Sequence, residues 1–221
     1  MSGTAPRTAA EYWDKYRPQR RSRPAADRFD WTGIPGNGPG AEILGTVNTA
    51  LDLGPAEGEN AAFLAHSGVQ VTAVDFSSTQ VERAQRFWRG TPNLTFVHDE
   101  ACNFLDQNDE SFDLIYSTWG AVWFTDPDEL LPRIAKRLSP GSLFAFSHRE
   151  STTSEYGAQQ MGGKWLEGRE TELTVLRWQY TLHQWADLLK HHGFTDVEAE
   201  IVPAPEASRL GTLIVRARIY N

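Results

Sequence analysis

The stretch "NTALDLGPAEGENAAFLAHSGVQVTAVDFSS", residues 48–78, decides the fold class of this chain. Its apolar run over 49–54 is typical of a buried parallel strand. A glycine-bearing turn follows, and then a helix that ends at Gly68 as a C-cap. A second apolar run, 69–75, closes on an acid, Asp75. The order strand, glycine turn, helix, strand and acid predicts a nucleotide-binding unit of the α/β class.

The glycine turn contains a glutamate, Glu57, and this residue restricts the choice of ligand. Gly54 and Gly58 allow a tight turn, and the free N–H groups at the helix start suit an anionic group. A pyrophosphate, however, would meet Asp52 and Glu57 at close range and be repelled. S-adenosylmethionine has no phosphate and carries a sulfonium cation. We therefore expect that cofactor here, with Asp75 accepting both ribose hydroxyls.

The remainder of the chain continues the alternation of strands and helices. Strands are expected over 93–98, 111–117 and 142–148, and helices over 77–90, 126–141 and 181–193. The last two expected strands, 194–202 and 211–220, are joined by the short segment "PAPEASRL", which is too short for a crossover helix, so they must be antiparallel. The predicted fold is a Rossmann-like, seven-stranded, mostly parallel sheet with an antiparallel C-terminal strand and helices on both faces.

Composition excludes several classes of protein. Hydrophobic residues make up 40% and charged residues 23% of the 221 residues, which is typical of one soluble domain. No apolar run approaches the roughly 20 residues of a membrane helix, and the N-terminal residues show no apolar signal segment. The single cysteine, Cys102, excludes an internal disulfide and a cysteine-based metal site, and favours a cytoplasmic location. The net charge of −8 argues against a nucleic-acid partner.

Two regions interrupt the pattern. Residues 1–28 contain seven basic and three acidic residues, including the run "RPQRRSRP". This run is either a basic arm for an anionic substrate or RNA, or a solvated, partly disordered lead-in, which we favour because Pro and Arg interrupt any apolar pattern. Residues 149–176 are polar and rich in glycine. We therefore expect an N-terminal lid or arm over 1–35 and a single domain over 36–221 with a cap insertion at about 149–176.

Five segments together carry a resemblance to a known family: "LDLGPAEG" (51–58), "VTAVDFS" (71–77), "VHDEACNFL" (97–105), "FDLIYSTWGAVWFTDP" (112–127) and "RLSPGSLFAFS" (137–147). They make the chain similar to the class I S-adenosylmethionine-dependent methyltransferases, in particular to the small-molecule branch with the ubiquinone/menaquinone-type enzymes. The resemblance covers the chain from about residue 40 onward. It departs from the family at Ala56, where glycine is commoner, and at Ser142, which replaces the second glycine of Pro-Gly-Gly.

The resemblance implies where the cofactor would bind. The turn would cradle the methionine part, the acid after the second strand would bind the ribose, and the next residue would pack on the adenine. Glu100 or Asp99 would lie beside the adenine amino group, and we favour Glu100 because Ala101 follows it. The implied cofactor-binding residues are Asp52, Gly54, Pro55, Ala56, Gly58, Asp75, Phe76, Glu100, Ala101, Ser117 and Trp119.

The acceptor side is less well marked in the sequence. His148 follows the fifth strand, at the edge where the carboxyl ends of the strands gather, and is our candidate general base; it could equally be a loop residue without a catalytic part. The chain has eight tryptophans. Three places border the expected mouth of the site and carry tryptophans: Trp13 and Trp31, Trp119 and Trp123, and Trp165, Trp178 and Trp185. We expect these tryptophans, in particular Trp31, Trp123 and Trp165, to form an aromatic wall for an apolar, aromatic or cationic acceptor, although core or lid packing would also explain them.

These inferences predict an enzyme that transfers a methyl group from S-adenosylmethionine to an O, N or C atom of a small metabolite, releasing S-adenosylhomocysteine. Two alternatives stay open: methylation of protein or RNA through the basic arm, and a non-catalytic cofactor-binding protein. A nicotinamide-dependent dehydrogenase is disfavoured by Glu57 and by the terminal strand pair. No metal, nucleic-acid or membrane partner is expected, and both a monomer and a homodimer are compatible with the sequence.

Overall fold

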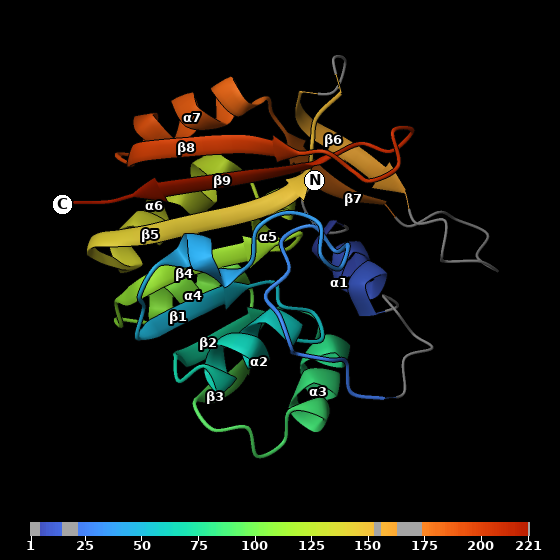
Figure 1. Cartoon of the computed structure of the whole chain (residues 1–221), viewed down its shortest axis with the longest axis vertical. Coiled ribbons are helices and arrows are strands. Elements are labelled where there is room, and N and C mark those ends of the chain that lie inside the picture. Colours follow the sequence, from blue (N-terminus) through green and yellow to red (C-terminus); the bar gives the residue numbers. More distant parts are fainter. Residues whose placement is uncertain (1–4, 15–21, 153–155, 163–173, 221) are drawn as a thin grey trace.

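Seven strands form the central sheet in the computed structural model, which describes residues 5–14, 22–152, 156–162 and 174–220 (Figure 1). The spatial order is β3-β2-β1-β4-β5-β9-β8. The strands are β1 (Thr49–Leu53), β2 (Gln70–Asp75), β3 (Leu94–His98), β4 (Phe112–Thr118), β5 (Leu138–Arg149), β8 (Thr195–Val202) and β9 (Thr212–Arg218). In this sheet, β9 is the strand that runs in the opposite direction to the other six, and it pairs antiparallel with β5 and β8. The predicted fold class is confirmed.

Helices follow the strands and begin at residues that suit helix starts. They are η1 (Ala41–Leu44), α2 (Glu59–His66), α3 (Ser78–Phe87), α4 (Ala101–Gln107), α5 (Ala121–Phe124), α6 (Pro127–Arg137) and α7 (Leu182–His191). The Ser77 hydroxyl accepts a hydrogen bond from the backbone N–H of Gln80 and so caps α3. Thr181 and Gln184 form the capping box of α7 that their spacing indicates.

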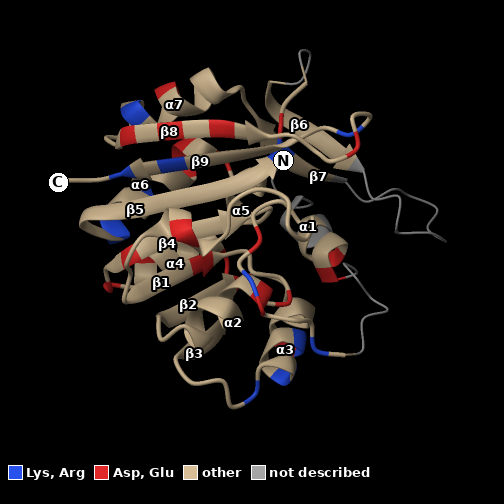
Figure 2. Cartoon of the chain, in the orientation of Figure 1, with Lys and Arg blue, Asp and Glu red and all other residues tan. Residues whose placement is uncertain are grey.

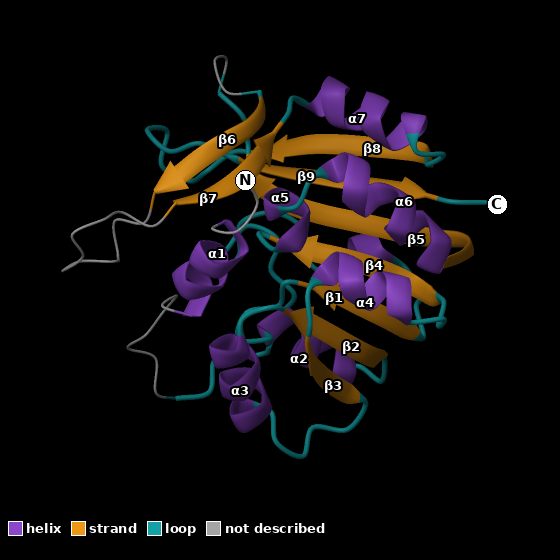
Figure 3. Ribbon diagram, turned by 180° about the vertical axis from the view of Figure 1, so that it is seen from behind, coloured by secondary structure: helices purple, strands orange, loops and turns teal. Residues whose placement is uncertain are grey.

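Side chains alternate along each strand, so the sheet has two apolar faces. Leu51, Ile115 and Phe144 pack in one cluster with residues of α4, α6 and α7. Their sequence neighbours Ala50 and Leu114 pack in a second cluster with residues of η1 and α2. Figures 1 and 3, seen from opposite sides, show these two helix layers covering the sheet. This two-sided burial is why the strands read as nearly continuous apolar runs.

Several elements were not predicted from the sequence. Helix α4 was not predicted, because its seven residues lie in a short loop-like stretch. Residues 5–14, for which no helix was predicted, form helix α1 (Ala5–Asp14) with Tyr12 only 1% exposed. Tyr12 packs in a cluster with Val175. The three arginines 17, 20 and 21 of the basic run lie outside the described residues.

The expected cap insertion contains regular structure as well. Strands β6 (Gly157–Gly162) and β7 (Thr174–Gln179) pair antiparallel as a separate two-stranded sheet. This sheet and α1 lie at the carboxyl ends of the parallel strands, where Figure 1 shows both next to the tip of β5. Within the described part of the chain, no helix has the length and apolar character needed to cross a membrane.

Candidate functional site

A cavity of about 1890 Å³ opens at the carboxyl ends of the parallel strands. It is larger than the roughly 300–1,000 Å³ of a site for one small ligand, so it has room for two ligands side by side. The "acidic half" of its lining comprises Asp52, Gly54, Pro55, Ala56, Glu59, Asn60, Asp75, Phe76, Glu100 and Ala101. The "aromatic half" comprises Tyr12, Trp13, Trp119, Trp123, Phe124, Thr125, Asp126, Gln160, Met161, Val175, Leu176 and Trp178.

The glycine turn is held in a backbone conformation that excludes larger residues. Gly54 has a φ of 82°, and a Cβ placed there would lie 2.6 Å from the backbone nitrogen of Ala121. A Cβ on Gly120, after β4, would lie 2.5 Å from the carbonyl oxygen of Leu53. The ends of β1 and β4 therefore touch backbone to backbone. Ala56 also has a positive φ, 49°, which explains why glycine is common at this position in the family.

Asp75 ties this turn to the end of β2. Its Oδ2 accepts a hydrogen bond from the backbone N–H of Ala56 at 3.1 Å, and its Oδ1 accepts one from the N–H of Ser77 at 2.9 Å. Burial raises the pKa of Asp75 to about 6. The carboxylate is thus fixed at the cavity surface and mostly ionised at neutral pH. Its remaining lone pairs can accept further hydrogen bonds from a ligand.

Asp52 lies deeper, opposite Tyr116 in the pairing of β1 with β4. Its side chain is 1% exposed, and burial raises its pKa to about 8. Asp52 is therefore largely protonated at neutral pH before a ligand binds. A cation placed beside it would favour the ionised form.

The electrostatic role expected for Glu57 was wrong. Its side chain is fully buried, makes an ion pair with Arg83 of α3, and does not line the cavity. Its carbonyl oxygen accepts a hydrogen bond from the Trp88 indole at 2.7 Å. The Glu57 charge is therefore compensated inside the protein, beneath α3. The electrostatic argument against a pyrophosphate now depends on Asp75 and Glu59, which do line the cavity. Figure 2 shows acidic residues on the loops between α1 and α3.

Phe76, Glu100 and Ala101 all line the acidic half, as the resemblance implies. Glu100 also caps α4, since its carboxylate accepts from the backbone N–H of Asn103 at 3.0 Å. Its competitor Asp99 does not line the cavity and instead accepts from the Asn103 side chain at 2.6 Å.

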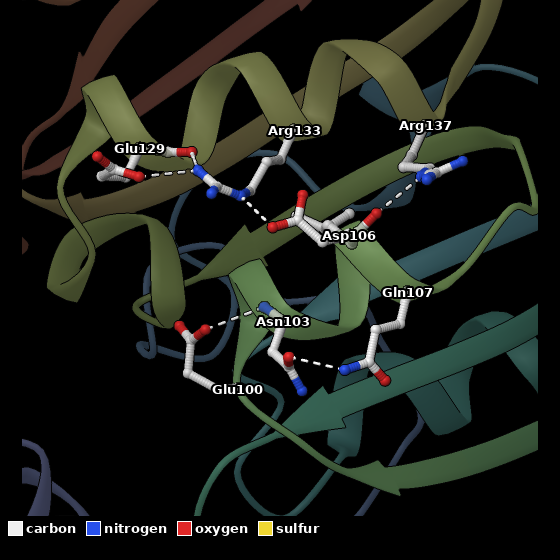
Figure 4. A network of polar contacts seen from close by, with 8 residues as sticks. Glu100, Asn103, Asp106, Gln107, Glu129, Arg133 and Arg137 are labelled. Carbon is white, nitrogen blue, oxygen red and sulfur yellow. Dashed lines mark hydrogen bonds and ion pairs between the residues drawn. The ribbon is translucent and has the colours of Figure 1, made fainter.

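Helix α4, which presents Glu100, is fixed to α6 by a polar network (Figure 4). Arg133 donates to Asp106 of α4 and to Glu129 of its own helix, both at 2.9 Å. Arg137 donates to the carbonyl oxygen of Leu105 at 2.8 Å. Exposed ion pairs contribute little stability singly. As a network they fix the last turn of α4 to α6.

Three residues expected at the site do not line the cavity. Gly58 begins α2 and is covered by the Phe96 ring. The Ser117 hydroxyl donates to the carbonyl oxygen of Leu53 at 2.7 Å, which joins β4 to β1. Trp31, expected in the aromatic wall, is fully buried and donates from its indole to Gly40 at 3.0 Å. Its ring belongs to the core, so an acceptor cannot reach it. Trp165 lies outside the described residues.

The structure also contradicts His148 as a general base. Its side chain is fully buried behind Trp123, with the two rings stacked at 5.4 Å between centroids. Nδ1 lies 2.7 Å from the carbonyl oxygen of Arg149. Burial lowers the pKa of His148 to about 4. Strand β5 extends to Arg149, so His148 lies within the strand and not after it. Because side chains alternate along a strand, His148 points to the same side as Phe146, into the core.

The aromatic half is built around Trp119, which has a positive φ of 54°. Its backbone N–H donates to Ser147 at 2.7 Å, and its indole N–H donates to the carbonyl oxygen of Trp31 at 2.9 Å. The edge of Trp119 meets Trp123 at 5.5 Å and an interplanar angle of 85°. A bulky residue in the left-handed region is strained and is often found at functional sites.

Three further rings line the aromatic half: Trp13 and Trp178, which belong to the tryptophans expected at the mouth of the site, and Phe124, which was not predicted. Trp13 of α1 meets Phe124 of α5 edge to face, with centroids 4.7 Å apart. Trp178 of β7 completes the described aromatic lining. No local pattern marks Phe124.

The comparisons with known proteins agree with this geometry. Residues 51–146 match the family model described as "Methyltransferase domain". The chain is 35% identical over 91 residues to demethylmenaquinone methyltransferase of Clavibacter sepedonicus, covering 41% of this chain and 37% of the relative. It is 25% identical over 184 residues to trans-aconitate 2-methyltransferase of Escherichia fergusonii, covering 81% and 62%. The chain thus spans less than two thirds of these curated relatives.

One solved structure is also similar. It is 1,6-didemethyltoxoflavin-N1-methyltransferase of Burkholderia thailandensis, with bound 1,6-didemethyltoxoflavin and S-adenosylhomocysteine. It shares 27% identity with a TM-score of 0.61, over 82% of this chain and 75% of that chain. The fold, the glycine turn, Asp75 and the comparisons therefore agree: residues 51–146 match a methyltransferase domain, and the chain is similar to S-adenosylmethionine-dependent methyltransferases that act on small molecules.

Proposed function

We propose that this protein transfers a methyl group from S-adenosylmethionine to a small-molecule acceptor, releasing S-adenosylhomocysteine. One observation carries the proposal: a cramped glycine turn and a fixed carboxylate, Asp75, border the acidic half of a cavity large enough for two ligands. This acidic surface suits a phosphate-free cation better than a dinucleotide. The 27% identical methyltransferase bound to S-adenosylhomocysteine and a small heterocycle supports the same reading.

The residues of the acidic half have distinct proposed roles. Asp75 would accept both ribose hydroxyls, Phe76 would pack on the adenine, and Glu100 would accept from its amino group. The turn from Gly54 to Ala56 would hold the methionine part, with Asp52 near its positive charge. When bound, S-adenosylmethionine supplies an electrophilic methyl group on a sulfonium. The protein contributes mainly by holding the acceptor in line and excluding water.

Calorimetry tests this function directly. We expect S-adenosylmethionine and S-adenosylhomocysteine to bind and NAD not to bind. Incubation with isotopically labelled cofactor and a metabolite mixture should then add one labelled methyl group to a small molecule. Cofactor binding without any methyl transfer would instead favour the non-catalytic binding protein.

We also propose the domain roles and the cellular context. Residues 1–35 would act as a lid and 149–176 as a cap, because α1, β6 and β7 border the cavity. A cytoplasmic location is supported by the lone Cys102, whose pKa burial raises to about 12, so that it remains a thiol. We propose no nucleic-acid partner, on the net charge of −8. Replacing the three arginines at 17, 20 and 21 by glutamine tests this, since an RNA or protein substrate would lose salt-sensitive turnover.

A further inference from the structure

The aromatic half is nearly free of charge, in contrast to the rest of the cavity. Among its described side chains only Asp126 is charged, and its Oδ1 accepts from the backbone N–H of Asp128 to cap α6. The two described arginines of the cavity lie on the loop at 22–35. Arg23 lies over the Trp88 ring at 5.4 Å, and Arg28 lies 3.7 Å from Asp27. No cluster of cations therefore faces the described aromatic half, as a polycarboxylate acceptor would need.

The rings of this half are held at fixed orientations. Trp119 is fixed by two hydrogen bonds and by its edge contact with Trp123. Trp123 is covered by His148 on one side, with the Arg177 guanidinium 5.5 Å from its centroid. Trp123 is thus a rigid support, and the half-buried Trp13, Trp119 and Phe124 offer the accessible ring surface. Fixed aromatic rings around an uncharged space select flat aromatic ligands.

The described cavity lining also offers no side chain placed to remove a proton from the acceptor. It contains no histidine, lysine or cysteine, and His148 is sealed behind Trp123. Tyr12 is 1% exposed and Asp126 is engaged as a helix cap. The carboxylates Asp52, Glu59, Asp75 and Glu100 belong to the acidic half. On the loop at 22–35, Asp27 lies 3.7 Å from Arg28, and Asp30 accepts hydrogen bonds from the backbone N–H groups of Thr32 and Gly33. An acceptor in the aromatic half must therefore reach its nucleophilic form without a base from the protein.

We propose that the acceptor is a flat aromatic or heteroaromatic compound that binds against Trp119 and is methylated at its own ring nitrogen, acidic N–H or acidic O–H. This inference rests on the proposed function. The acceptor's lone pair forms the new bond to the methyl carbon, sulfur keeps the electron pair of the bond that breaks, and any proton passes from the acceptor to water. Trp119 lies one residue from Gly120, which touches the glycine turn, so an acceptor against it adjoins both halves.

Two sets of probes test the substrate class with labelled cofactor and mass spectrometry. The first set holds xanthines, pteridine-diones and hydroxyquinolines; the second holds trans-aconitate, tricarballylate, ethanolamine and putrescine. We expect methyl transfer within the first set only. Methylation of any member of the second set, or of neither set while S-adenosylhomocysteine still binds, overturns the inference and leaves the proposed donor site standing. Absence of S-adenosylhomocysteine binding overturns the proposed function and this inference with it.

Trp119 is tested by binding as well as by turnover. Trp119→Leu should weaken binding of the methylated probe about tenfold, by calorimetry on protein saturated with S-adenosylhomocysteine. Trp119→Phe keeps a ring and should fall between this variant and the native protein. Trp185→Phe, in the core and outside the cavity, is the matched control. Equal probe binding by the native protein and Trp119→Leu overturns the role of Trp119.

The pH dependence of kcat/KM tests the acceptor's own nucleophile. For two aromatic acceptors that differ in acidity, the inflection should move with the pKa of the acceptor. An inflection at the same pH for both acceptors would show an enzyme base and overturn this part of the proposal.

Discussion

The acidic and aromatic halves of one cavity are built in different ways. The acidic half comes mainly from short segments that follow β1, β2 and β3, and each carries a pattern that can be read locally. The aromatic half joins α1, the segment after β4, and the β6–β7 sheet, which are far apart in the sequence. A local sequence motif is therefore enough to predict the donor site. The acceptor site forms only when segments that are far apart in the sequence pack together.

The largest expected effect concerns a residue beside the acidic half that does not belong to it. Arg83→Met should remove the ion pair that Arg83 makes with the buried Glu57 carboxylate and lower the free energy of unfolding by about 3–5 kcal/mol. Denaturant titration measures this change. Arg89→Met, at an exposed position just beyond α3, should change it by no more than about 0.5 kcal/mol. If Arg83→Met lost only cofactor affinity and no stability, Glu57 would have to face the ligand after all.

His148 provides a test behind the aromatic half. Its folded pKa is lowered to about 4, so between about pH 6.5 and 4 the unfolded state binds more protons, and stability falls as the pH falls. His148→Phe should remove this loss, giving a difference from the native protein that grows to about 3 kcal/mol at pH 4. The raised pKa values of Asp52 and Asp75 act in the opposite sense and are common to both proteins.

Thermal or urea unfolding at several pH values measures the His148 effect, with the exposed His183→Phe as the control. A variant that unfolded as the native protein does at each pH, yet lost turnover, would restore His148 as a base.

Asp75→Asn tests the fixed carboxylate of the acidic half. It keeps the shape but loses the charge that would strengthen two hydrogen bonds to the ribose, so the Kd for S-adenosylhomocysteine should rise about 10- to 100-fold. Calorimetry measures it. Asp99→Asn removes a nearby carboxylate that does not line the cavity and should change the Kd about twofold or less. Equal losses in the two variants would mean that the adenosine lies elsewhere.

The smallest expected effect is a pH dependence of donor binding. Because burial raises the pKa of Asp75 to about 6, the ionised form is a minority at pH 5. Binding that needs the ionised form should be about tenfold weaker at pH 5 than at pH 7. Asp75→Asn should show no such dependence. If the native protein bound the donor equally well at pH 5 and pH 7, donor binding would not depend on the ionised Asp75 carboxylate.

Sequence reasoning succeeded where a signal is local. The mostly parallel sheet with its antiparallel last strand followed from the alternation of strands and helices and from the short 203–210 connection. The position of Asp75 at the cavity followed from a strand end, and that of Glu100 from the family resemblance. It failed where tertiary packing decides the direction in which a side chain points. Glu57 turns beneath α3 to meet Arg83, and β5 carries His148 into the core. Neither side-chain orientation can be predicted from the neighbouring residues in the sequence.

The pair Gly54 and Gly120 has a consequence for motion. Neither position has room for even one additional carbon atom. The ends of β1 and β4 are therefore packed without free space at the boundary between the two halves. Any adjustment to ligands of different size would then come from the elements that border the cavity and not from these strand ends. Helix α1 is one such element, and its contacts include hydrogen bonds from Ser77 to Asp14 at 2.5 Å and from Gln80 to the carbonyl oxygen of Trp13 at 2.8 Å.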